Sequence, residues 1–94
     1  MIYLVATARA KPGHEDALRA SLESLIAPTL REAGCVQYDL HEEVETPGAF
    51  LFYEIWESQS HLDAHAASVH LSTHQARAAE WLDDNRLIFL RKHG

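Results

Sequence analysis

The residues best suited to chemistry lie in the second half of the chain. His65 stands three residues before Ser68 and five before His70, and it follows an apolar stretch that contains Glu54. An imidazole changes its protonation near neutral pH, so His65 could act as a general base. The structural alternative is a histidine that is hydrogen-bonded to the backbone. We take His65 as the candidate base.

Glu54 is the second candidate catalytic residue. It lies in the middle of a strongly apolar strand-like stretch, where an ionised carboxylate is costly unless it is paired. One interpretation is that Glu54 orients His65, as carboxylates orient histidines in many sites. The other is a structural ion pair between Glu54 and Arg9 or Arg86.

Aromatic and further histidine side chains supply candidates for substrate binding. Tyr38 and Trp56 stand in predicted strands and could form the walls of an aromatic pocket, although large aromatic residues in strands often belong to a plain core. His41 and His70 are additional candidates. The expected ligand of such a pocket is a small aromatic molecule.

Metal and cofactor motifs are weak. The pairs His61/His65 and His70/His74 have i,i+4 spacing, which can present two imidazoles to one ion, but no acidic or thiol side chain completes a recognisable zinc set. Cys35 is expected to be a small buried thiol, not a nucleophile. The sequence also has no glycine-rich phosphate loop and no nucleophile elbow. We therefore expect neither a metal nor a cofactor.

Composition narrows the class of protein. Ninety-four residues are enough for one domain, residues 1–94, and a net charge of −6 argues against nucleic acid and anionic membranes as partners. No apolar run is long enough to cross a bilayer. The N-terminus alternates like a strand and lacks a basic leader, and the single cysteine suits a reducing compartment, so a cytoplasmic location is expected.

Hydrophobic periodicity predicts the elements that must position these residues. Apolar residues alternate in four strands and recur at helical spacing between them. The predicted strands are 2–10, 35–43, 49–57 and 86–92, and the predicted helices are 14–33, a short one starting at Ser58 or Ser60 and ending near 67, and 69–82. Pro28 predicts a kink or a restart in the first helix but not two separate helices. Gly34 fits a left-handed C-terminal position, and residues 83–85 are expected to form a turn.

The order β-α-β-β-α-α-β predicts an α+β ferredoxin-like fold, in which helices cover one face of an antiparallel sheet. Residues 2–8 and 50–56 are apolar on both faces. Because a solvated sheet face should be more polar, we expect a homodimer in which the second face of the sheet packs against another copy.

Three segments in this order resemble the antibiotic biosynthesis monooxygenase domain family of dimeric α/β barrels. They are residues 34–40 (GCVQYDL), 52–57 (FYEIWE) and 62–70 (LDAHAASVH), and the resemblance covers nearly the whole chain. The combination of Tyr-Glu-x-Trp with His-x-x-Ser-x-His is similar to the family's core signature. Val69 departs from it, because relatives often have proline there.

The resemblance implies a dimeric α/β barrel and several possible activities. The leading hypothesis is a cofactor-independent monooxygenase of a small phenol or quinol, with His65 as base, Glu54 as its orienter, and Tyr38, Trp56, His41, Ser68 and His70 around the substrate. A haem-degrading enzyme fits less well, because the first strand has no Asn and His65 replaces the expected Trp. An isomerase on the same scaffold and a binding or stress-response module without turnover are the alternatives, because fold does not determine function.

Overall fold

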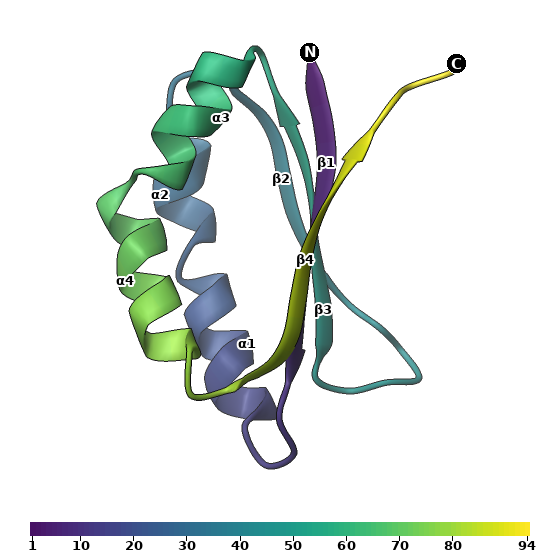
Figure 1. The fold of residues 1–94 in the computed structure, drawn as a ribbon, viewed down its shortest axis with the longest axis vertical. Coiled ribbons are helices and arrows are strands. Elements are labelled where there is room, and N and C mark those ends of the chain that lie inside the picture. The colour runs from purple at the N-terminus through teal and green to yellow at the C-terminus, as the bar shows by residue number, and fades with distance from the viewer.

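A computed structural model describes all residues, 1–94, as a four-stranded antiparallel sheet with every helix on one side of it (Figure 1). The strands stand in the order β2-β3-β1-β4. The elements in chain order are β1 (Ile2–Ala10), α1 (Glu15–Glu23), α2 (Ile26–Leu30), β2 (Cys35–Glu42), β3 (Ala49–Trp56), α3 (Gln59–Ala66), α4 (Val69–Ala78) and β4 (Leu82–Leu90). The predicted α+β ferredoxin-like fold is confirmed.

Strand register defines the two faces of the sheet. Leu4 pairs with Glu54 and Ala6 pairs with Phe52, and because paired residues point to the same side, all four face the helices. This inner face forms the core together with leucines of α1 and the following turn. The buried core residues are Leu4, Ala10, Leu18, Leu22, Leu25, Tyr38, Phe50, Phe52, Trp56, Leu62 and Ala78.

The outer face of the sheet is apolar as well, as the alternation in the sequence predicted. Its central residues are all half-buried, although no element of the chain covers them. They are Tyr3, Val5, Leu51, Tyr53, Ile55 and Ile88. An apolar patch of this kind is typical of a contact surface.

The expected single helix 14–33 is wrong. The chain forms α1 and α2, separated at Ser24 and Leu25, and Pro28 is the third residue of α2. A proline in the first turn of a helix costs little, because the N–H it lacks would have no partner there. Starting a new helix therefore costs less than bending one around Pro28. Gly34 has the predicted positive φ of +79°, although it lies in the turn after α2 and not directly at a helix end.

The C-terminal boundaries also differ from the prediction. α4 ends at Ala78, not at residue 82, and the expected turn at residues 83–85 is part of β4, which begins at Leu82 and ends at Leu90. Asp84 pairs with Arg9 in the ladder, and Asp83 forms an ion pair with Arg9 at 3.1 Å. An edge strand leaves such polar side chains in water, so strand pairing overrides their turn propensity.

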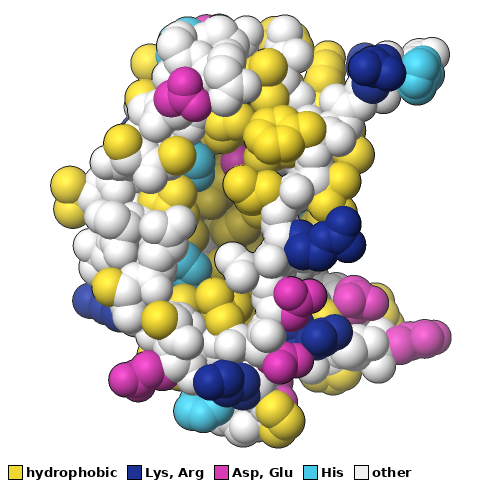
Figure 2. Space-filling model, in the orientation of Figure 1, with side chains coloured by type: hydrophobic (Ala, Val, Ile, Leu, Met, Phe, Trp, Pro, Cys, Tyr) yellow, Lys and Arg dark blue, Asp and Glu magenta, His cyan; other side chains and the backbone are white.

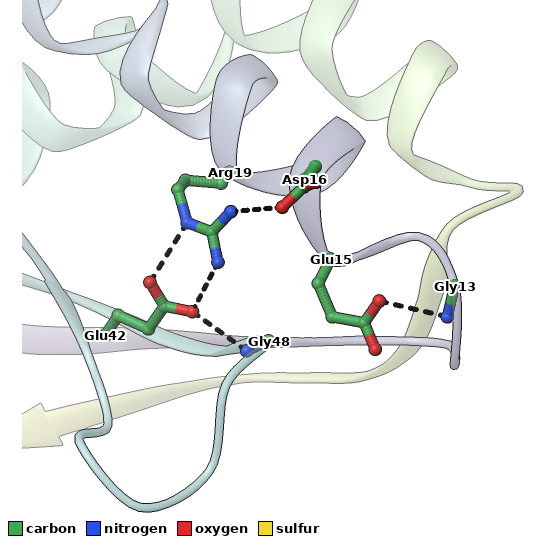
Figure 3. A network of polar contacts seen from close by, with 6 residues as sticks. All are labelled: Gly13, Glu15, Asp16, Arg19, Glu42 and Gly48. Atoms are coloured by element: carbon green, nitrogen blue, oxygen red, sulfur yellow. Dashed lines mark hydrogen bonds and ion pairs between the residues drawn. The ribbon is translucent and has the colours of Figure 1, made fainter.

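A polar network fixes α1 to the turn end of the sheet (Figure 3). Arg19 donates to both carboxylate oxygens of Glu42 in β2, at 3.0 and 2.7 Å, and to Asp16 at 2.6 Å. Glu42 also accepts from the backbone N–H of Gly48, and these contacts hold the pKa of Glu42 below its usual value. The network therefore ties α1 to the end of β2. No helix in the chain is long and apolar enough to cross a membrane.

Candidate active site

His65 is held against the aromatic residues of the sheet. α3 begins where the Ser58 side chain accepts from the N–H of His61, so Ser58, and not Ser60, is the cap. The His65 ring lies 4.7 Å from the Trp56 ring and 5.5 Å from the Tyr38 ring, measured between centroids. The structure thus brings together three of the predicted site residues, and His65 is only 4% exposed.

Glu32 is the carboxylate that binds His65. It lies in the turn between α2 and β2, and its Oε2 is 2.6 Å from Nδ1 of His65 and 2.9 Å from Nε2 of His70. An ionised carboxylate only accepts hydrogen bonds, so both ring nitrogens must be donors. This contact fixes the tautomer of His65: the proton is on Nδ1, and Nε2 keeps its lone pair when the ring is neutral.

Glu54 was predicted to orient His65, but the carboxylate bonded to His65 is Glu32, so the prediction named the wrong residue. Oε1 of Glu54 accepts from the indole N–H of Trp56 at 3.0 Å, and Glu54 makes no hydrogen bond to His65. The alternative ion pair is wrong too, because Arg9 and Arg86 lie on the outer face of the sheet and Glu54 on the inner face. Burial raises the pKa of Glu54, and the Trp56 hydrogen bond opposes that shift.

Two of the predicted site residues, His65 and Glu54, each leave one polar side-chain atom without a hydrogen bond. Only Thr29 Oγ1 is both sealed from solvent and without a hydrogen bond. His65 Nε2 and the second oxygen of Glu54 also make no hydrogen bond, and they are not completely sealed from solvent. The Tyr38 hydroxyl is close enough to the Thr29 side chain for that contact to oppose the rise of the Tyr38 pKa. Burial, followed by the nearby charge of Glu54, raises the pKa of Tyr38 far above its usual value, so its hydroxyl stays protonated and can donate.

Figure 2 shows a hollow between the helices and β4. Its interior is apolar, histidine side chains lie on its helical wall, and an acidic side chain is visible inside. In the strand register Leu87 faces the same side as Ala6, and Phe89 the same side as Leu4. Leu87 and Phe89 nevertheless remain 65% and 57% exposed. The helices therefore leave the β4 side of the site open.

Two predicted binding residues lie elsewhere or have another role. Ser68 is the N-cap of α4, where its hydroxyl accepts from the N–H of Leu71 at 3.3 Å. His41 is on the outer face, where it lines a depression of about 690 Å³ together with Arg9 and Arg86. The structure does not bring His41 to the His65 site. Successive residues of a strand point to opposite faces, so His41, three residues after Tyr38 in β2, points away from the face on which Tyr38 meets His65.

The two i,i+4 histidine pairs do not converge on a common point. Nδ1 of His61 contacts the Ser58 hydroxyl, and Nδ1 of His74 contacts the Ser21 hydroxyl, each at 2.8 Å. His65 of the first pair and His70 of the second pair contact Glu32 instead. The candidate ligand atoms of Glu32, His65 and His70 all lie within 4.8 Å of one another. Nothing in the sequence spacing marked Glu32, because it is 33 residues from His65 and lies in an irregular turn.

The antibiotic biosynthesis monooxygenase family model matches residues 1–77, so the chain belongs to that family. Rv0793 of Mycobacterium tuberculosis, provisionally named as a monooxygenase, is 35% identical over 81 residues, which cover 86% of this chain and 79% of Rv0793. YcnE of Bacillus subtilis, also provisionally named as a monooxygenase, is 29% identical over 82 residues, which cover 87% of this chain and 86% of YcnE. The crystal structure of PA3566 from Pseudomonas aeruginosa superposes with a TM-score of 0.95 at 32% identity, over 99% of this chain and 94% of PA3566.

Proposed function

We propose that this protein is a cofactor-independent monooxygenase of a small phenol or quinol, with His65 as its general base. The observation that carries the proposal is the environment of His65. One ring nitrogen is anchored to Glu32 at 2.6 Å, the ring lies against Trp56 and Tyr38, and the other nitrogen makes no hydrogen bond within the chain. Membership of the monooxygenase family gives the reaction class.

The proposed reaction starts when Nε2 of His65 takes the phenolic proton. Glu32 stabilises the imidazolium that forms, as a carboxylate does for a catalytic histidine. The phenolate transfers an electron to O₂, and recombination of the radical pair forms a carbon–peroxide bond on the ring. His65 then returns its proton to the peroxide. Loss of water, which carries away one oxygen atom and the hydrogen of the attacked carbon, leaves the quinone with the other oxygen atom.

The remaining side chains bind the substrate and exclude water. Tyr38 and Glu54 lie beside His65, Tyr38 directly and Glu54 through Trp56, and in this scheme the second oxygen of Glu54 and the hydroxyl of Tyr38 hydrogen-bond the substrate's oxygen atoms. Since burial favours the protonated form of Glu54, its carboxyl group can donate as well as accept. The Trp56 ring supplies an apolar wall for the aromatic ring of the substrate.

Oxygen uptake with a panel of phenols and quinols tests the activity, using purified protein without added cofactor. Incorporation of one ¹⁸O atom from ¹⁸O₂ into the product distinguishes an oxygenase from an oxidase. His65→Gln should lower the rate about 100-fold, the usual scale for loss of a positioned base, and the exposed His14→Gln should not. Full activity of His65→Gln, or binding without oxygen uptake across the panel, would overturn the proposal. Double-bond migration without oxygen uptake would indicate the isomerase alternative.

Glu32 and His65 should behave as one unit in that assay. Glu32→Gln should also lower the rate about 100-fold, and the double variant should lose little more, because residues that act together are not additive. Glu54 contacts the substrate separately in this scheme, so Glu54→Gln should combine additively with His65→Gln. Additive losses for Glu32 and His65 would contradict the positioning role.

The proposal includes a homodimer that packs through the outer face of the sheet, whose half-buried apolar residues support it. Sedimentation at micromolar concentration should give about twice the chain mass of 10.6 kDa. Ile55→Asp on that face should give monomers, whereas Val44→Asp, in an exposed turn, should not. A monomeric wild-type protein would refute the dimer.

A further inference from the structure

We propose that Glu32, His65 and His70 form a zinc-binding site, and that zinc bound there switches off the base. The chemistry of the donor set supports this. Two imidazole nitrogens and one carboxylate oxygen match the ligands that Zn²⁺ takes in open, three-residue sites. The binding of zinc stands independently, whereas its effect on turnover rests on the proposed function.

The cluster is close to the geometry that zinc needs. Ligand atoms about 2.0–2.2 Å from a tetrahedral zinc ion lie about 3.4 Å apart. Oε2 of Glu32 is 2.6 Å from the His65 nitrogen and 2.9 Å from the His70 nitrogen, so the atoms must separate by about 0.5–0.8 Å to admit an ion with these bond lengths. The side chains of Glu32 and His70 are 17% and 24% exposed and can make this adjustment, while the aromatic rings hold His65 in place.

Zinc would change which nitrogen of His65 carries the proton. In the structure both histidines donate an N–H to Glu32, so an ion that replaces these hydrogen bonds must displace both protons. A neutral histidine can keep its proton by moving it to the other nitrogen. His65 ligated through Nδ1 then carries its proton on Nε2. That atom can no longer accept a phenolic proton, so zinc should inhibit the oxygenase.

The ligand types also predict selectivity. Imidazole nitrogens suit Zn²⁺ and its transition-metal neighbours, whereas Mg²⁺ and Ca²⁺ prefer oxygen ligands. Two nitrogens in three positions therefore favour zinc over either hard cation. Because the Glu32 and His70 side chains are partly exposed, a water molecule can reach this side as the fourth ligand.

The test is a zinc titration of chelator-treated, desalted protein against a chromophoric chelator, with folding of each variant checked by circular dichroism. We expect one zinc ion per chain, no competition by millimolar Mg²⁺, and a shift of the His65 proton to Nε2 in long-range ¹H–¹⁵N spectra. Glu32→Gln and His70→Asn should each weaken binding about 100-fold or more, since even outer-shell changes cost about 10–100-fold. His14→Asn is the matched control, because His14 is exposed and its side chain makes no capping hydrogen bond.

Each outcome bears on a separate part of the proposal. Equal zinc affinity in wild type, Glu32→Gln and His70→Asn, or no binding at micromolar zinc, would overturn the site. If an oxygenase substrate is found, saturating zinc should abolish its turnover and a chelator should restore it. Undiminished turnover with zinc bound would overturn the inhibition but leave the site. Zinc binding in a protein that has no oxygenase activity would support the site and refute only the proposed function.

Discussion

Glu32 offers the sharpest test of the site, because its effect is measurable without a substrate. The carboxylate accepts from Nδ1 of His65 and from Nε2 of His70. The wild-type protein should therefore hold His65 as the Nδ1–H tautomer and His70 as the Nε2–H tautomer. Glu32→Gln removes the negative charge and leaves one amide oxygen to serve two N–H groups.

The expected loss of stability follows from these contacts. A hydrogen bond to a charged group contributes about 1.5–3 kcal/mol and a neutral one about 1 kcal/mol. The His65 bond changes from charged to neutral in a nearly sealed position, while His70 loses its bond but can reach water. Glu32→Gln should therefore destabilise the fold by about 2 kcal/mol, which lowers Tm by about 10 °C in a domain of this size. Glu23→Gln, an exposed position without contacts, should change stability by less than about 0.5 kcal/mol.

Two measurements check the prediction. Long-range ¹H–¹⁵N spectra at about pH 8, above the ordinary pKa of histidine, report the tautomers of His65 and His70. Urea unfolding at a fixed protein concentration gives the difference between Glu32→Gln and Glu23→Gln. An Nε2–H tautomer of His65 in the wild type, or a Glu32→Gln variant as stable as Glu23→Gln, would refute the reasoning.

Three further predictions concern the fold. Burial lowers the pKa of His74, so the unfolded chain takes up a proton as pH falls below about 6.5 while the folded chain does not. Relative to His74→Gln, the wild type should therefore lose up to about 1.4 kcal/mol of stability between about pH 7.5 and 5.5, measured by urea unfolding. The same dependence of stability on pH in both proteins would contradict this. Pro28→Ala should change stability by less than about 1 kcal/mol in the same assay, because Pro28 lies in the first turn of α2; a gain near 3 kcal/mol would mean that proline interrupts a continuous helix. Gly34→Ala should lower Tm by roughly 8 °C or more, because φ is +79° and the new Cβ would lie 2.2 Å from the His61 ring; an unchanged Tm would contradict that geometry.

Strand patterns made the layers of the fold predictable. Residues two apart share a face, so the alternation of Phe50, Phe52, Glu54 and Trp56 with Leu51, Tyr53 and Ile55 fixed both sides of β3 in advance. The same reasoning did not separate His41 from Tyr38, although their spacing of three residues puts them on opposite faces. That error was avoidable from the sequence alone.

Contacts formed by irregular segments were not predictable. Glu32 follows α2 in a turn whose path depends on where the helix breaks, and the expected continuous helix 14–33 placed it differently. The polar run 83–85 has strong turn propensity, and only its pairing with β1 makes it a strand. Both errors arise because local preference is weaker than tertiary contact.

The hydrogen-bonding of buried polar groups gives the strongest physical reason to regard the His65 region as a site. His74 is buried as well, and its Nδ1 contacts the Ser21 hydroxyl while its Nε2 makes no hydrogen bond, so an unused ring nitrogen alone does not mark a site. His65 and Glu54 are buried as deeply and each also leaves one polar atom without a hydrogen bond, but they lie together, both in contact with Trp56. Burying half-satisfied polar groups lowers stability, and apolar residues of similar size would avoid that cost. We therefore propose that this pairing of His65 and Glu54 beside Trp56 serves a ligand that completes their hydrogen bonds.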